Sequence, residues 1–305
     1  MVLRTTGRAF LGEAELTERE GAVLLALAGT VFSFTAVAYR AVDAANDWQF
    51  LAYRGGSTAL AMLGLVALRH RSRPVDFVAT TWKAIVAGFL LAITSMLYIL
   101  ALSRISAATT LLLLAAAPVY AAVFGWLLLR ERVHSATFIA IGVTMVGVAI
   151  MVGTGLDAGS GMGLVFAMLI PALVGLYNVV LRSAPGTDPV VPALLAGVFL
   201  ALGATAAALA NGGLAVSWRD AALACVSGGV ALGIGLPLFN LGHRSVPAAR
   251  VSLLLMTEIV LAPLWVWIWP GETPRVGTLI GGAIVLAAVV WLVTKSSDSE
   301  DLLIV

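Results

Sequence analysis

Ten stretches of this sequence are apolar over the length needed to cross a lipid bilayer, which is about 20 residues. The backbone of a segment in lipid must satisfy its own hydrogen bonds, and segments of this length do so as helices. The sequence therefore predicts an all-α polytopic membrane protein. Its ten transmembrane helices are expected at 20–39, 48–68, 82–103, 107–129, 135–152, 160–181, 190–210, 218–242, 248–269 and 275–294.

Composition agrees with a lipid environment and argues against several functions. Apolar residues make up 61% of the chain and charged residues 11%, against about 45–50% and about 25% in soluble domains. With a net charge of +2 and no patch rich in Lys and Arg, we expect the bilayer as a partner and no nucleic acid. The HExxH, GxSxG and Walker motifs are missing, so we expect no enzyme, no metal site and no cofactor.

The positions of Lys and Arg predict the orientation of the helices, because these residues favour cytoplasmic loops. If the N-terminus is cytoplasmic, most of them lie at cytoplasmic helix ends. The exceptions are Arg40, Arg104, Arg219 and Arg275 at the outer ends, and Arg54 inside a helix. Both termini are therefore expected in the cytoplasm.

The second half of the sequence repeats features of the first half at a nearly constant spacing. Glu131 corresponds to Glu272, and Trp126 to Trp267, both 141 residues later. The alternative is that any two apolar helices look alike, but paired glutamates and tryptophans at one spacing favour a repeat. Each copy then contains five of the predicted helices.

The repeat divides the chain into four segments: a cytoplasmic segment 1–19, repeats at 20–152 and 160–294, and a cytoplasmic tail 295–305. Because five is an odd number, the second copy must enter the membrane upside down relative to the first. Secondary transporters built this way bind their substrate near the middle of the bilayer, between the two repeats. The sequence therefore predicts two inverted five-helix repeats around a central cavity.

Three stretches carry a resemblance to a known family: ALSRISAA…P…LLLRE at 101–131, FNLG…PAA…LLLMTE…GE at 239–272, and YRGG at 53–56. Together with the ten predicted helices, they resemble the EamA-type branch of the drug/metabolite transporter superfamily. The resemblance implies an exporter or permease for amino acids, nucleotide-sugars or small organic cations. It is strongest to bacterial inner-membrane exporters, among them exporters of aromatic amino acids. The chain departs from the family at Ile259, where a proline commonly follows the glutamate.

Glu258 lies near the middle of the ninth predicted helix. A carboxylate there costs at least about 2.5 kcal/mol unless it faces water, has a partner or is protonated. It could carry a proton, bind a substrate ammonium group, or be a neutral acid that hydrogen-bonds neighbouring helices. Trp265 follows two helical turns later on the same face. It is expected to line the same cavity, although Trp is also common near membrane interfaces.

Arg54 lies inside the second predicted helix, near its outer end. Two arrangements are open. The side chain could extend along the helix until its charged head reaches the outer surface near Asp47. Alternatively, the guanidinium turns inward and binds a carboxylate, either of the substrate or of a facing helix.

Aromatic residues stand beside polar ones in several other predicted helices. The remaining expected cavity residues are Phe32, Tyr98, Tyr177, Asn178, Phe239 and Asn240. A cavity with aromatic walls and few charges suits an apolar or aromatic cargo, while the scarce polar groups orient its ends. The alternative for each aromatic residue is ordinary helix packing.

Together these features predict a secondary transporter that exports aromatic or bulky neutral amino acids by alternating access, as a monomer. Other small metabolites or drug cations are the alternative cargo; a nucleotide-sugar would need more cationic residues inside the bundle than Arg54. A membrane enzyme and a scaffold protein are distant alternatives. Proton drive through Glu258 and facilitated diffusion are both open.

Overall fold

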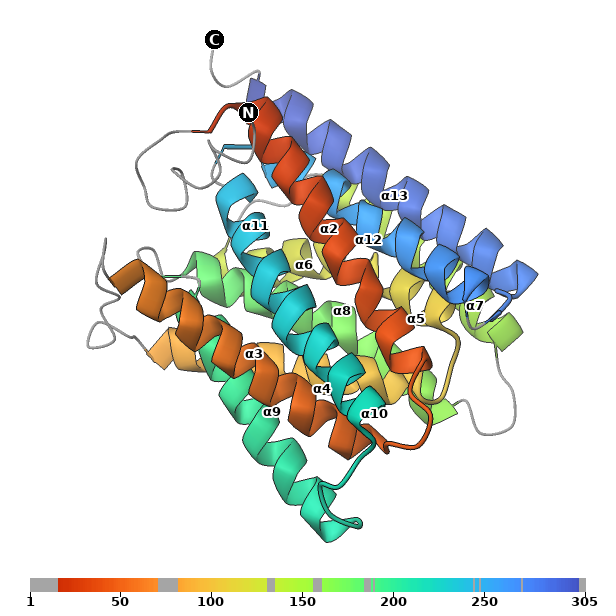
Figure 1. Cartoon of the computed structure of the whole chain (residues 1–305). Coiled ribbons are helices and arrows are strands. Elements are labelled where there is room, and N and C mark those ends of the chain that lie inside the picture. Colours follow the sequence, from red (N-terminus) through yellow and green to blue (C-terminus); the bar gives the residue numbers. More distant parts are fainter. Residues whose placement is uncertain are drawn as a thin grey trace.

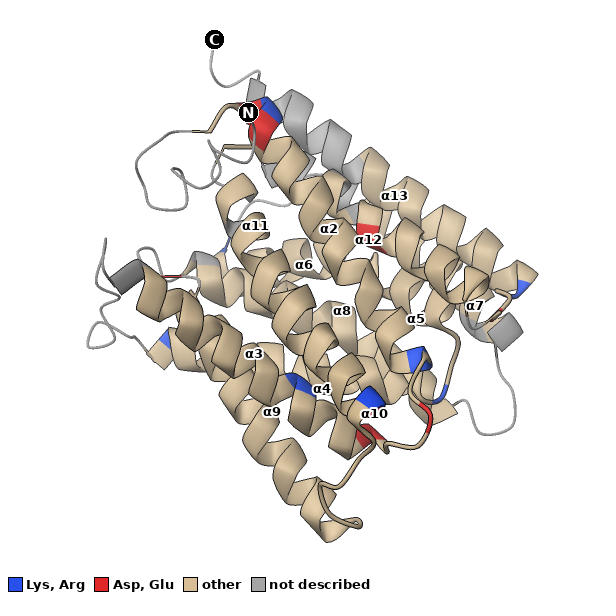
Figure 2. Ribbon diagram, in the orientation of Figure 1, with Lys and Arg blue, Asp and Glu red and all other residues tan. Residues whose placement is uncertain are grey.

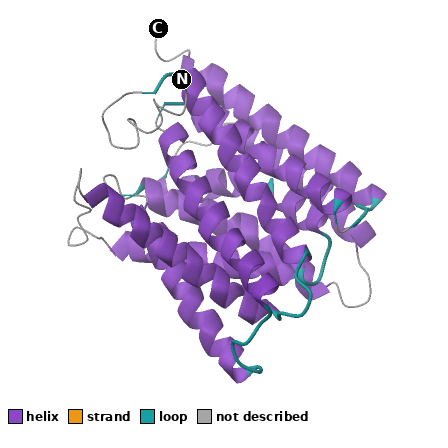
Figure 3. Ribbon diagram, viewed as in Figure 1, coloured by secondary structure: helices purple, strands orange, loops and turns teal. Residues whose placement is uncertain are grey.

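The computed structural model describes residues 16–70, 82–130, 135–155, 161–183, 188, 190–243, 245–246, 248–269 and 271–301. Within these ranges the chain consists of helices and short connections, without a strand (Figure 3). Most of the predicted N-terminal segment lies outside the described residues, and so does Glu131, the expected counterpart of Glu272.

Helices occupy each of the predicted windows within the described ranges, and two windows contain more than one helix. In chain order the helices are α2 (Glu18–Arg40), α3 (Asp47–His70), α4 (Trp82–Leu102), α5 (Ala107–Leu114), α6 (Ala117–Leu129), α7 (Ser135–Gly155), α8 (Gly161–Arg182), α9 (Val190–Ala210), α10 (Trp218–Cys225), the π-helix η1 (Val226–Leu232), α11 (Gly233–His243), α12 (Ala248–Ile268) and α13 (Val276–Asp301).

Seven helical segments of the described chain are long and apolar enough to cross a membrane, judged by length and composition. The other three predicted windows contain the shorter apolar helices Phe138–Met151, Thr257–Ile268 and Val276–Trp291. The expectation of an all-helical, multi-pass membrane protein is therefore confirmed. The count of ten membrane-spanning helices stays a prediction.

Polar residues at the first turns explain where some of the helices begin. At the start of α2, the Glu20 N–H donates to Thr17 Oγ1 at 3.3 Å, and the Thr17 N–H donates to Glu20 Oε2 at 3.0 Å. Ser106 precedes α5, and its Oγ accepts from the Thr109 N–H at 3.1 Å. Such caps satisfy backbone donors that have no partner within the helix. The Thr17 cap therefore places the start of α2 two residues before its predicted window, and the Ser106 cap places the start of α5 at the first residue of its window.

The fourth predicted window is interrupted in the structure. α5 ends at Leu114 and α6 begins at Ala117, with Pro118 in its first turn. Proline has no N–H to donate, and its ring clashes with the preceding turn of a helix. The Val119 N–H donates to the Ala116 carbonyl at 3.0 Å, which is the tighter spacing of a new helix start. This window is therefore two half-helices in line.

The eighth predicted window contains the π-helix η1 between α10 and α11. Such turns are rare, and they are frequently found at functional sites. Gly228 of η1 lies directly against the Arg54 carbonyl and Ser57 of α3, and the space between them would not hold a Cβ atom. The π-helix thus brings this window into close contact with α3 at Arg54.

The helices form two groups, joined on two sides by a pair of helices (Figure 1). In one group α2 packs against η1, α11 and α12; in the other α8 packs against α4, α5 and α6. We call these the α2 group (α2, α10, η1, α11 and α12) and the α8 group (α4, α5, α6 and α8). The pair α3–α9 joins them, since α3 contacts η1 and α9 contacts α4, and the pair α7–α13 lies on the side of α5 and α12.

Charged residues gather mainly at the ends of the helices (Figure 2). At the end of α2, a buried carboxylate fixes the α2–α3 connection to α10: Asp220 is 1% exposed and accepts from the N–H groups of Asp43, Ala44 and Ala45 at 3.0, 3.1 and 3.0 Å. Arg219 forms an ion pair with Asp43 beside it. This connection is therefore held to the start of α10 by several bonds.

Two glycines allow the backbones of α3 and α9 to approach closely. A Cβ atom at Gly55 would lie 2.5 Å from the Ala201 nitrogen, and one at Gly197 would lie 2.6 Å from the Ala59 nitrogen. Gly55 comes before Ala59 in α3, but its partner Ala201 comes after Gly197, the partner of Ala59, in α9. The two helices therefore run antiparallel. Close backbone packing at small residues is a common way to join helices in a membrane.

We expect Gly55→Ala to lower the midpoint of thermal unfolding of the detergent-purified protein, because overpacking costs about 1–3 kcal/mol. The neighbouring Gly56→Ala is the control, since nothing lies within 4 Å of its Cβ position. It should leave the midpoint unchanged or raise it slightly, because Ala favours a helix more than Gly. Equal midpoints for the two variants would contradict the close α3–α9 contact.

Candidate functional site

Arg54 of α3 lies in the interior of the bundle, with 4% of its surface exposed. Its Nε donates to Ser95 Oγ of α4 at 3.1 Å, and its Nη1 donates to Ser227 Oγ of η1. Ser95 belongs to the α8 group and Ser227 to the α2 group, so the guanidinium connects the two groups. Of the two arrangements considered for Arg54, the structure has the inward one. Asp47 instead accepts a hydrogen bond from Tyr39.

The hydrogen-bond partners of Arg54 are neutral, which is unusual for a buried charge. No described residue accepts a hydrogen bond from Nη2, and no described carboxylate lies within ion-pair distance. A buried charge without a counter-ion is costly unless another group compensates for it. A guanidinium in this state can bind a carboxylate through two parallel hydrogen bonds. The arrangement therefore has the chemistry of a carboxylate-binding site.

Two more polar groups lie near this guanidinium. Tyr98 of α4 is 7% exposed, and its hydroxyl has no hydrogen-bond partner among the described residues. Glu258 of α12 is partly exposed and forms no hydrogen bond or ion pair with a described residue. Its carboxylate is close enough to Arg54 for the two charges to attract each other. The structure thus brings together three of the predicted residues, each able to form further bonds to a ligand.

Two predicted aromatic residues, Trp265 and Phe32, are held by contacts within the α2 group. The Trp265 indole N–H donates to Ser33 Oγ at 3.0 Å, and its ring stacks on Phe34 with centroids 5.6 Å apart. The Phe32 ring lies directly against Gly235 of α11. These rings are therefore fixed in orientation, but their contacts do not reach Arg54.

Four other predicted residues are not gathered around Arg54 by any contact that the structure describes. Tyr177 is partly buried on α8, and the neighbouring Asn178 is exposed. Phe239 of α11 packs in an apolar cluster with Leu25. Asn240 lies on α11, with its side chain outside the described part of the chain.

The two serines that bind Arg54 were not among the candidate residues. A hydroxyl in a strongly apolar helix is itself a signal, and Ser95 lies one turn before Tyr98 on the same helix face. Ser227 is harder to find, because it lies in η1. A π-helical turn changes the direction of the side chains that follow it, so the regular helical period does not predict where Ser227 points.

Ser227→Ala should lower the midpoint of thermal unfolding, because it leaves an N–H of the buried guanidinium without an acceptor, at a cost of about 1–3 kcal/mol. Ser57→Ala is the matched control. Its hydroxyl donates to the Arg54 carbonyl within α3 at 3.0 Å. It packs against Gly228 of η1 but forms no hydrogen bond to another described helix. If Ser227→Ala unfolds at the wild-type midpoint, the bond between Ser227 and Arg54 is not an important contact.

Two segments of the chain, residues 19–153 and 161–294, match the family described as the EamA-like transporter family. No curated protein matches the chain. Several solved structures match the chain. One of them aligns with a TM-score of 0.64 and 17% sequence identity, over 90% of this chain and 98% of that chain. At this identity the likeness shows a shared fold and no more.

Proposed function

The chain belongs to the EamA-like transporter family, whose members are membrane transporters and not enzymes, and on this premise we propose that it exports amino acids. The cargo is an aromatic or bulky neutral amino acid, carried across the cell inner membrane by alternating access. The proposal includes function as a monomer, without a cofactor or a nucleic-acid partner. Other small metabolites and drug cations are the competing cargo.

The observation that carries the proposal is a buried cation with neutral hydrogen-bond partners, close enough to a carboxylate on another helix for the two charges to interact. Arg54 on α3 has only Ser95 and Ser227 as hydrogen-bond partners, and Glu258 on α12 has none among the described residues. An amino acid carries one carboxylate and one ammonium group. Its carboxylate would bind the guanidinium and its ammonium group would bind Glu258, so one zwitterion satisfies both.

The surroundings favour a cargo with an apolar side chain. Tyr98 offers a free hydroxyl beside the charged groups, and Trp265 and Phe32 supply rigid rings on the α2 group. Sites for small molecules commonly combine aromatic walls with a few polar groups that orient the ligand. In the proposed complex the two charges fix the ends of the amino acid, and its side chain would extend toward these rings.

Helix directions support two inverted repeats. Gly163 at the start of α8 lies against Ile105, just before α5, and Gly175 lies against Tyr120 of α6. α8 therefore runs in the same direction as α5 and α6. Arg40 at the end of α2 also binds Ile105, so α2 runs in the opposite direction. The first helices of the two family-matched segments are thus antiparallel.

The packing pattern supports the same symmetry. α2 packs against α11 and α12, and α8 packs against α4 and α6, which are their counterparts if the two segments are exchanged. Exchanging the two segments would put α3 in the place of α9 and α7 in the place of α13. Each of these two contacting pairs therefore stays the same pair. The start of α2 and the end of α13 lie at the same end of the bundle (Figure 1), which fits the proposed cytoplasmic location of both termini.

Arg54→Ala should reduce the initial rate of phenylalanine flux in proteoliposomes by about tenfold or more, since a hydrogen bond to a charged group contributes about 1.5–3 kcal/mol. Phenethylamine, the same molecule without its carboxylate, should lose much less. Equal losses for the two compounds would assign Arg54 to structure and not to recognition of the carboxylate.

Glu258→Gln tests whether Glu258 carries protons. If it does, flux driven by a pH gradient should disappear in this variant, while downhill exchange of the amino acid persists at a reduced rate, because Gln cannot release a proton. The measurement is uptake with and without an imposed gradient. Gradient-driven uptake that survives the change would reject proton coupling through Glu258 and leave facilitated diffusion.

The cargo itself is tested by a flux panel of amino acids, nucleotide-sugars and quaternary cations in proteoliposomes. We expect aromatic and bulky neutral amino acids to move and to compete with one another. Movement of quaternary cations alone, with Glu258 indispensable and Arg54 dispensable, would instead identify a cation exporter.

A further inference from the structure

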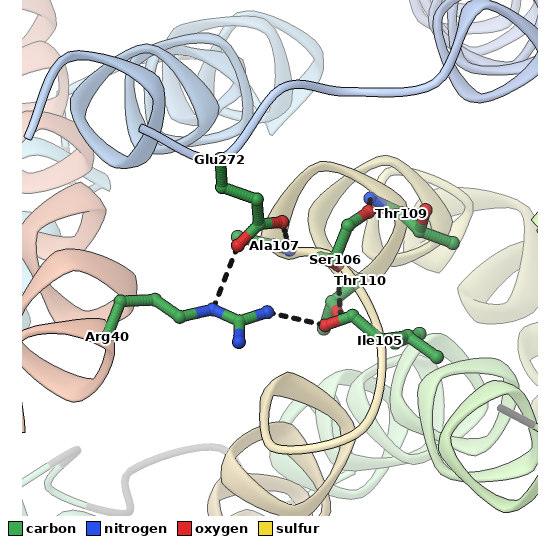
Figure 4. A network of polar contacts seen from close by, with 7 residues as sticks. All are labelled: Arg40, Ile105, Ser106, Ala107, Thr109, Thr110 and Glu272. Atoms are coloured by element: carbon green, nitrogen blue, oxygen red, sulfur yellow. Dashed lines mark hydrogen bonds and ion pairs between the residues drawn. The ribbon is translucent and has the colours of Figure 1, made fainter. Parts of the chain in front are cut away.

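A polar network joins the α2 group to the α8 group at the end of the bundle where α2 ends (Figure 4). Arg40, in the last turn of α2, donates from Nη2 to the Ile105 carbonyl at 2.6 Å, and its Nε lies 3.0 Å from Glu272 Oε2. Glu272, between α12 and α13, accepts from the Ala107 N–H through Oε1 at 2.7 Å. We propose that Arg40 and Glu272 form a gate that closes this end of the transport path.

These bonds join the two groups at this end of the bundle. Arg40 of α2 reaches the Ile105 carbonyl just before α5, and Glu272, just after α12, reaches the Ala107 N–H. Other polar contacts lie at the same end: Tyr39 of α2 lies near Ser103, and Arg104 lies 3.5 Å from Asp47 of α3. Thr109 of α5 also contacts Thr278 of α13 at 3.2 Å. The Asp220 bonds tie α10 to the α2–α3 connection and do not reach the α8 group. A motion that parts the two groups at this end therefore has to break the Arg40 and Glu272 bonds, while the Asp220 bonds can persist.

The network can open without unfolding α5. Ser106 caps this helix by accepting from the Thr109 N–H, and that bond lies entirely within the α8 group. Glu272 accepts from Ala107, a donor at the helix start that the Ser106 cap leaves free. When Glu272 withdraws, water can replace it, because the side chains of Arg40 and Glu272 are about a quarter exposed.

The chemistry of the network suits reversible closure. A carboxylate is attracted to the positive end of the α5 dipole, and its attraction to Arg40 is partly screened by water and salt. The N–H of Arg40 Nε is not aligned for a hydrogen bond although it is within ion-pair distance of Glu272, so this contact is electrostatic only. A fully buried pair would be costly to separate, and a fully exposed pair would add little.

The gate rests on the proposed alternating access, but not on the proposed amino acid cargo. In the orientation proposed above, it lies at the outer end of the bundle and closes the path to the outside. The Arg54 site lies on α3 between the same two groups, so opening at Arg40 and Glu272 would give that site access to one side of the membrane.

The distance between the two groups at this end tests the gate directly. Spin labels are placed at Met162, which is exposed at the start of α8, and at Thr273, beside Glu272. Cys225, the one cysteine of the chain, is first replaced by Ala. Electron paramagnetic resonance distances are measured in nanodiscs without any cargo. Without further changes, the labelled protein should give one main short distance. Glu272→Gln and Arg40→Gln should each move a measurable fraction of molecules to a longer distance.

Asp43→Asn is the matched control, because it removes an ion pair at the same end, to Arg219, that does not reach the α8 group. It should leave the distance distribution unchanged. The gate is overturned if both Arg40→Gln and Glu272→Gln keep the original distribution, or if Asp43→Asn changes it as much. If one gate variant does not fold, the other decides. Since no cargo is present, failure of amino acid flux would leave this result unaffected.

Discussion

A bilayer offers the backbone no hydrogen-bonding partner, and most of this structure follows from that constraint. This constraint forces apolar segments into helices. A helix is interrupted only at a residue that cannot continue it or where a neighbouring helix packs closely against it. The break between α5 and α6 comes immediately before Pro118, which cannot continue the ladder of backbone hydrogen bonds. The π-helix η1 lies where Gly228 meets the backbone of α3 at Arg54. Both interruptions are surrounded by other helices of the bundle.

The buried guanidinium of Arg54 connects the fold with the proposed transport. α3 is held to α9 by close packing at Gly55 and Gly197, while the two partners of Arg54 come from different helix groups. A cargo bound at Arg54 would therefore contact α3, which is packed tightly against α9, and the two groups that move in the proposed alternating access. Arg40 and Glu272 join the same two groups at one end with full charges. In the proposed cycle, the guanidinium with its neutral serine partners recognises the cargo, and the contacts between a cation and a carboxylate at the end close the path.

Part of the candidate site could be predicted from the sequence, because charge inside an apolar segment is conspicuous. Arg54 and Glu258 stand out for that reason, and the structure places their charges near each other. Aromatic residues are less informative, since apolar helices pack with them everywhere: Phe239 lies in a packing cluster away from Arg54. Asn178 shows the same limit, because a polar residue beside an aromatic one does not reveal which face of the helix turns inward; this one is exposed.

The sequence by itself determined that the chain is a multi-pass helical membrane protein, where its helices lie, and that two charges sit within them. These properties depend on local apolarity and length, which do not change with the surroundings of a segment. Only the tertiary structure decided that Arg54 turns inward to Ser95 and Ser227, and that Glu272 meets the start of α5. Such pairings depend on the rotation and direction of whole helices. Those are set by contacts between residues far apart in the chain, which no local pattern encodes.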